Sequence, residues 1–106
     1  MADSGKLSSE GQRALELFKT QLDVMPTIRN FRGVTPEFAQ WKDATTQLFL
    51  KYLPDSSCYN RFSIIQFGAA HSAPDRYLRG CDLAEQCIRA AIQDIERSDV
   101  KAAGRS

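Results

Sequence analysis

The chain has 106 residues, of which 42% are hydrophobic and 25% charged, and its formal net charge is +1. This length fits a single domain, and this composition is close to the globular average, so a largely disordered chain is excluded. A net charge so close to zero argues against a strongly electrostatic mode of binding to nucleic acid or to a membrane surface.

Sequence features that mark export or membrane insertion do not occur. No run approaches the ~18 apolar residues of a membrane-spanning helix, and the N-terminus, MADSGKLSSEG, lacks the apolar core of a secretory signal. Three cysteines without a CxxC pair indicate reduced thiols rather than a disulfide framework. We therefore expect a cytoplasmic protein with no membrane partner.

The first predicted element is a helix over residues 10–24. Ser9 followed by Gln12 fits a capping box, in which each side chain satisfies a free backbone N–H of the first turn. Large apolar residues then recur at helical spacing, namely Leu15, Phe18, Leu22 and Met25. Pro26 is expected to end this helix, and residues 1–8 before it are expected to be flexible.

Residues 27–34, TIRNFRGV, are predicted to be a connection, because Asn and Gly favour turns. We expect Ile28 and Phe31 to pack beneath the helices. Arg29 and Arg32 are expected to remain in solvent.

The segment 36–53 has the clearest helix signals of the chain. Thr35 is a suitable N-cap, and a proline at the first helical position loses no hydrogen bond. One apolar stripe follows, made by Phe38, Trp41, Thr45, Leu48 and Tyr52. Pro54 ends the helix. Trp41 lies on the stripe, so it is interpreted as a core residue rather than a binding residue.

The segment 58–67, CYNRFSIIQF, is ambiguous from its pattern. Its apolar run is short enough to be a strand or a buried helical turn. We favour a short helix at about 58–63 that runs into a buried extended segment. A true strand would need a partner strand from another chain or from an unpredicted edge.

A third long helix is predicted over residues 74–97. It carries the most regular seam of the sequence, formed by Tyr77, Cys81, Ala84, Ile88, Ala91 and Ile95, with Leu78, Leu83 and Ile92 widening it. The fold class is therefore all-α, with three main helices. One helical domain is expected over 9–97, followed by a flexible tail over 98–106.

Residues that could carry out catalysis are few. His71 is the single histidine, and Cys58 and Cys81 are the thiols that could accompany it, at a spacing that matches no zinc site. No glycine-rich phosphate-binding motif occurs. Glu85 with Arg89 has the spacing of an ion pair on a solvated helix face, as does Arg79 with Asp82. We expect no cofactor, no metal and no enzymatic activity.

A group of arginines offers one candidate binding site. If the loops meet at one end of the molecule, they would form a modest patch for an anion or nucleic acid together with Tyr59 and Tyr77. The arginines concerned are Arg29, Arg32, Arg61, Arg76 and Arg79. Ordinary solvated loop charges are the alternative interpretation.

The order of these features resembles a known family. The residues concerned are Phe38, Trp41 and Thr45, followed by Phe62, Ile65 and Phe67. The pattern F-x-x-W-x-x-x-T, then a turn and F-x-x-I-x-F, resembles the small helical domain that precedes Toll/interleukin-receptor-like or nucleotide-binding effector domains in bacterial defence and signalling proteins. The resemblance implies a helical interaction domain and transfers no catalytic residue. Only a short tail follows the helices, so an effector domain is expected to be absent or on another chain.

Three long helices in so short a chain leave apolar surface on residues 36–53 and 74–97. We therefore expect a protein–protein interaction or oligomerisation module, whose partner is another protein or a second copy. The alternative is a small nucleic-acid or anion-binding protein that uses the arginines.

Overall fold

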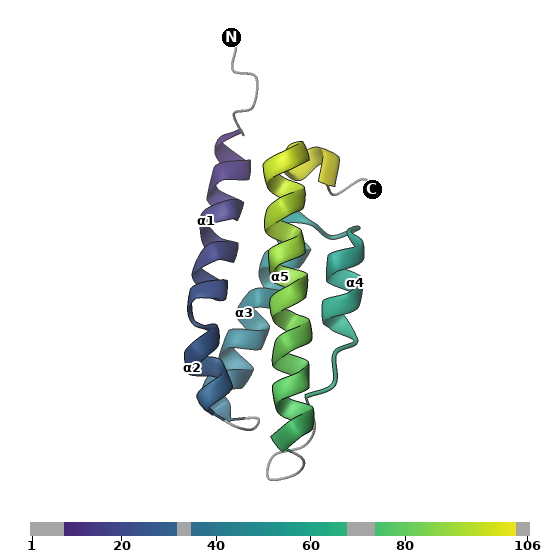
Figure 1. Cartoon of the computed structure of the whole chain (residues 1–106). Coiled ribbons are helices and arrows are strands. Elements are labelled where there is room, and N and C mark those ends of the chain that lie inside the picture. Colours follow the sequence, from purple (N-terminus) through teal and green to yellow (C-terminus); the bar gives the residue numbers. More distant parts are fainter. Residues whose placement is uncertain (1–7, 32–34, 68–73, 104–106) are drawn as a thin grey trace.

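A computed structural model of the chain describes residues 8–31, 35–67 and 74–103 (Figure 1). The predicted loop that contains His71 lies outside these residues, as does Arg32. The expectations for residues 1–7 and 104–106 also fall outside them.

The described residues form α-helices and no strand. The helices are α1 (Ser9–Asp23), α2 (Met25–Asn30), α3 (Pro36–Tyr52), α4 (Ser57–Ser63) and α5 (Pro74–Ala103). The predicted all-α class and its three long helices are confirmed. None of the helices in this part of the chain is long and apolar enough to cross a membrane.

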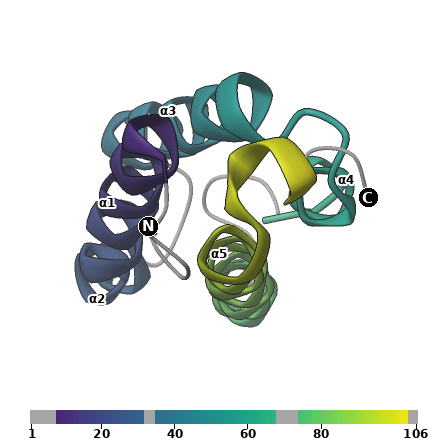
Figure 2. The ribbon, with the colours of Figure 1, turned by 90° about the horizontal axis from the view of Figure 1, so that it is seen from above.

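The helices form four walls around one core. Helices α1 and α2 follow each other along one wall, and α3 returns beside α1 (Figure 1). Helix α4 packs between α3 and α5, and α5 closes the ring against α1 and α2 (Figure 2). Successive walls run in opposite directions, as in an up-and-down four-helix bundle.

Two predictions about the segment that forms α1 and α2 are wrong. The N-cap is Ser8 rather than Ser9, and its hydroxyl accepts from the backbone N–H of Gly11 at 3.0 Å. Adjacent serines have the same capping chemistry, so the pattern could not separate them. Pro26 does not end the helical wall, because it lies in the first turn of α2, where a missing N–H costs nothing. Residues 27–30 are thus helical rather than a connection.

The predicted core is confirmed in its main features. The seam residues of α5 are completely buried: Tyr77, Cys81, Ala84, Ile88, Ala91 and Ile95. Thr35 caps α3 by accepting from the N–H of Phe38 at 3.0 Å. Trp41 is 7% exposed, and its indole N–H donates to the carbonyl of Gln21 at 3.3 Å, so it is a core residue with a satisfied polar edge.

The segment after α4 is only partly as predicted. The short helix at 58–63 is confirmed as α4, and Ile65, Gln66 and Phe67 that follow are non-helical. Phe67 is 5% exposed, but Ile64 is 75% exposed, so the prediction of a buried segment is wrong at Ile64.

The end of α5 lies beyond its predicted bound. The helix continues to Ala103 rather than ending at residue 97. Polar residues at the end of a helix form its last turns as readily as they form a tail, so composition alone did not fix this boundary.

Candidate functional site

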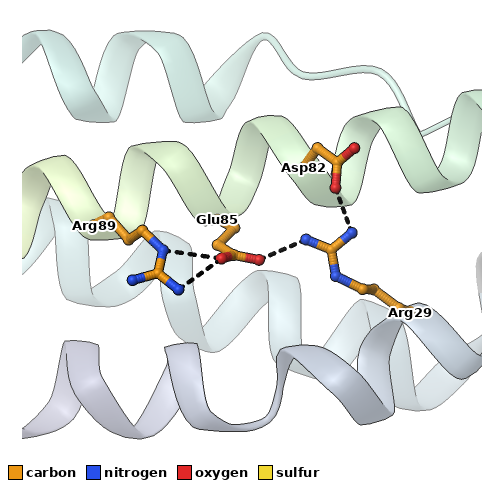
Figure 3. Close-up of polar contacts among 4 residues, drawn as sticks. All are labelled: Arg29, Asp82, Glu85 and Arg89. Carbon is orange, nitrogen blue, oxygen red and sulfur yellow. Dashed lines mark hydrogen bonds and ion pairs between the residues drawn. The ribbon is translucent and has the colours of Figure 1, made fainter.

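The predicted arginine group is divided between two sides of α5. Arg29 projects from α2 and donates to the carboxylates of Asp82 and Glu85 on α5, at 2.5 Å for Glu85 (Figure 3). Arg89 donates to the other oxygen of Glu85 at 2.9 Å, which confirms the predicted pair. Arg29 is therefore half-buried in a network between helices, not free in solvent as predicted.

This network also shifts the pKa of Glu85. Hydrogen bonds from Arg29, and then from Arg89, hold the pKa of Glu85 below its ordinary value of 4.5. The predicted ion pair between Arg79 and Asp82 is not among those of the described residues, since Asp82 faces Arg29 instead. Arg29 and its two carboxylates thus fasten α2 to α5.

The aromatic residues of the predicted patch do not form a stacking surface. Tyr77 is completely buried, and its hydroxyl donates to the carbonyl of Ile28 at 2.5 Å. Burial raises the pKa of Tyr77 well above its ordinary value. Tyr59 is half-buried, with its ring centroid 6.2 Å from that of Phe49. Both rings therefore act mainly as packing residues.

The other described arginines of the predicted group, which are Arg61, Arg76 and Arg79, lie on the α4 side of α5. Arg61 lines a hollow of about 280 Å³ together with Ile64, Ile65, Gln66, Leu83, Gln86 and Cys87. Arg76 and Arg79 line a second hollow of about 410 Å³ together with Gln66, Asp75, Gly80 and Leu83. Because Gln66 and Leu83 belong to both, we treat the two hollows as one feature, the α4–α5 groove.

Apolar side chains lie open at the centre of this groove. Ile64 is 75% exposed and Leu83 is 44% exposed, although both are large aliphatic residues. Leu78, Leu83 and Ile92 were predicted to widen the buried seam of α5. The prediction is confirmed for Ile92, which is 8% exposed, but it is wrong for Leu78 and Leu83, which are 38% and 44% exposed. The side chain of Leu83 turns toward the α4 side and solvent.

The local sequence explains why Ile64 faces outward. The N–H of Ile65 donates to the carbonyl of Phe62 at 3.3 Å, which closes a turn at the end of α4. Phe67 then enters the core, where its ring centroid lies 4.7 Å from that of Phe38. Burying Phe67 in this short extended stretch leaves Ile64 on the surface.

Gly80 allows this segment to lie directly on α5. A Cβ at Gly80 would stand 2.6 Å from Cδ1 of Phe67 and 3.2 Å from the carbonyl oxygen of Gln66. Any residue with a side chain would therefore push the segment away from the helix. Glycine at this position sets the width of the α4–α5 groove.

The charge on the groove is mostly positive. Arg61, Arg76 and Arg79 take part in no ion pair among the described residues, and Asp75 is the one acidic residue in the lining. The groove thus combines an apolar centre with three arginines and one aspartate, and none of the three arginines is ion-paired within the described part of the chain.

The three thiols do not behave as activated nucleophiles. Cys58, Cys81 and Cys87 are free and buried. Burial, and then the charge of Asp94, raises the pKa of Cys58 to about 11, and the Cys58 thiol lies 3.6 Å from a carboxylate oxygen of Asp94. Burial also raises the pKa of Cys81 and of Cys87. A nucleophilic cysteine needs the opposite shift.

Two other hollows are less distinctive. One lies beside α3, with Lys42, Asp43 and Thr46 among its lining residues. The other lies between α1 and α5, with Lys19, Asp23, Arg89 and Gln93 among its lining residues. Neither lining contains an exposed large apolar residue, because Phe38, Phe67 and Ile92 are buried and Leu22 and Ile65 are half-buried. The α4–α5 groove therefore differs from both in its exposed apolar centre.

Part of this site could have been recognised from the sequence. Leu83 is an apolar residue with Arg79 four positions before it and Gln86 three after it, so it has polar neighbours on its own helix face. Ile64 had no such signal, because its outward direction depends on the burial of Phe67. Comparisons with protein-family models, with curated proteins and with solved structures found no match.

Proposed function

We propose that this chain is a non-enzymatic interaction module that binds a protein partner through the α4–α5 groove. The observation that carries the proposal is the exposure of Ile64 and Leu83 in the lining of one hollow. Large aliphatic residues that gather on a small surface, with polar residues around them, are typical of the centre of a binding site.

The energetic gain at this site is large enough to matter. Complete burial of an isoleucine or leucine side chain from full exposure is worth about 1.5–3 kcal/mol. Because Ile64 is 75% exposed and Leu83 is 44% exposed, burial of their remaining surface would contribute about 2–4 kcal/mol, against which stands the entropic cost of association. A few such central contacts dominate the affinity of most interfaces.

The second candidate function is the binding of an anion or a nucleic acid. Arg61, Arg76 and Arg79 favour it, because they lie on one side of α5 without ion pairs among the described residues. Arg29 is committed to Asp82 and Glu85. Tyr77 is buried, and Tyr59 is half-buried against Phe49. Without an aromatic platform, single-stranded nucleic acid would lack the stacking that such sites use, so a protein partner is the better-supported candidate.

The proposed cellular role rests on the resemblance of the core residues to the helical domains of bacterial defence and signalling proteins. A helical module in bacterial defence or signalling would recruit an effector or a second copy, and the groove offers the surface for that contact. This setting is part of the proposal and adds no residue to the site.

Site-specific photo-crosslinking tests the proposal. A photoreactive amino acid replaces Leu83 in one variant and Leu50 in the control, because Leu50 on α3 is 43% exposed and so matches the 44% of Leu83. We expect a defined crosslinked protein from the Leu83 position, absent when Ile64→Gln is added, and no corresponding product from Leu50. Equal products from both positions, or none from Leu83, would remove the groove as a binding site.

A further inference from the structure

We propose that the occupant of the α4–α5 groove is an acidic amphipathic helix of the partner protein. This inference rests on the proposed function and specifies the chemistry of the partner. It follows from the length of the groove, from the nature of its walls and from its charge.

The length of the groove suits a short helix. Its lining on α5 runs from Asp75 to Cys87, which corresponds to about 18 Å at 1.5 Å per residue. That distance accommodates about three helical turns, which place two or three side chains of one face against the groove.

The walls of the groove favour a helix over a strand. Most of the lining residues belong to α4 or α5, whose interior N–H and C=O groups already form helical hydrogen bonds. An added strand would find few backbone partners there, whereas a helix satisfies its own backbone and needs only a groove for its apolar face.

The charge distribution selects an acidic partner. Arg61 stands on the α4 side of the apolar centre, and Arg76 and Arg79 stand toward the start of α5. The opposite side of α5 shows the contrast, because there Arg29 already has two carboxylates. Asp75 is the one acidic residue in the lining against three arginines, so the groove keeps an excess of positive charge. Glutamates or aspartates that flank the apolar residues of a partner helix would pair with these arginines and guide its approach.

A display selection tests this inference. Randomised helical peptides on phage are selected for binding to the full chain and counter-selected against the Leu83→Gln variant. The affinities of the selected peptides are then measured by fluorescence anisotropy at low and high salt. Arg79→Glu is the test variant, and Arg13→Glu is its control, since Arg13 is exposed on α1 and gives the same change in net charge.

We expect selected peptides with apolar residues at steps of three and four and with acidic residues around them. Arg79→Glu should weaken their binding roughly tenfold, added salt should weaken it further, and Arg13→Glu should leave it unchanged. Circular dichroism should show the same helicity in all variants, because these arginines are exposed.

The opposing outcomes are distinct. Peptides that need Leu83 but are neutral or basic would overturn the acidic partner and leave the groove as a binding site. Failure to select any peptide that needs Leu83 would contradict the proposed function itself.

Concentration-dependent sedimentation abolished by Leu83→Gln would identify a second copy as the occupant. Binding of RNA or DNA oligonucleotides lost in Arg79→Glu but kept in Leu83→Gln would favour the nucleic-acid alternative. Either of the last two outcomes would overturn the inference.

Discussion

The two sides of α5 differ in whether their surface side chains have partners within the molecule. Toward α1 and α2, the helix carries Asp82, Glu85 and Arg89, and these charges pair across or along the helices (Figure 3). Toward α4, it carries Leu83 and Arg79, which are exposed and take part in no such pairs among the described residues.

The difference shows which side of α5 has its charges paired within the molecule and which side keeps exposed apolar area. On the first side, Asp82, Glu85 and Arg89 all have an ion-pair partner within the molecule. On the second side, apolar area and positive charge both remain available. The side without internal partners is therefore the better candidate for an external one.

The largest expected effect concerns the attachment of the α4 side to the core. Phe67→Ala should lower the free energy of unfolding by about 3–5 kcal/mol, because it removes a buried ring that contacts Phe38 and Tyr77. Urea denaturation measures the loss. Ile64→Ala, three residues earlier and mostly exposed, is the control and should change stability by less than about 0.5 kcal/mol. Equal losses in the two variants would mean that the segment is not anchored by Phe67.

A smaller loss is expected for Gly80→Ala. Alanine favours a helix over glycine by about 1 kcal/mol, but the new methyl group would overlap the ring of Phe67. Overpacking of this kind costs about 1–3 kcal/mol, so we expect a net loss of about 1 kcal/mol.

Urea denaturation also tests whether Gly80→Ala lowers or raises the free energy of unfolding. Gln86→Ala on the same helix is the control, because Gln86 is exposed and should tolerate the change. A more stable Gly80→Ala protein would contradict the close approach of the segment to α5.

The next largest loss of stability is expected from a substitution in the ion-paired network between α2 and α5. Arg29→Ala should destabilise the protein by about 1 kcal/mol at neutral pH, because it leaves Asp82 and Glu85 without their cross-helix partner. Arg13→Ala is the control, as Arg13 is exposed and has no ion pair among the described residues.

The pH dependence of this variant gives a second test. Arg29 lowers the pKa of Glu85 in the folded state below 4.5. The stabilisation is therefore complete above the ordinary pKa and disappears as the pH falls through the lowered one. The difference between wild type and Arg29→Ala should shrink in acid. A difference that grew as the pH fell would contradict the pairing.

The smallest effect on stability is expected at the centre of the groove. Leu83→Gln and Leu50→Gln should each change the free energy of unfolding by less than about 0.5 kcal/mol, since both leucines are substantially exposed. Thermal denaturation measures this change. Only Leu83→Gln should reduce partner binding. A large loss of stability in Leu83→Gln would mean that this leucine is structural, and it would weaken the contrast between the two sides.

The sequence predicted the features that depend on neighbouring residues. The seam of α5 followed from helical spacing, and the start of α3 followed from Thr35 with Pro36, because caps and periodicity are local properties. It did not predict α2, since Pro26 was interpreted as the end of a helix rather than as part of the first turn of a new one.

The candidate binding surface was harder to predict, because it depends on contacts between residues far apart in the sequence. Arg29 meets Asp82 across 53 positions of the chain, and no local pattern indicates that pairing. The outward direction of Ile64 similarly depends on the place of Phe67 in the core and on the missing side chain at Gly80. Arg61, Arg76 and Arg79 were recognised as candidates, but their separation from Arg29 needed the fold.

The position of α5 in chain order has a consequence for biosynthesis. This helix follows every other described element, yet its Tyr77 bonds to Ile28, 49 residues earlier, and its seam covers the core. At roughly 5–20 residues per second, the 30 residues of α5 take about 2–6 s to synthesise. During those seconds the side chains of α1 and α2 that pack on α5 in the folded chain have not yet met it, so the core closes only once α5 is made.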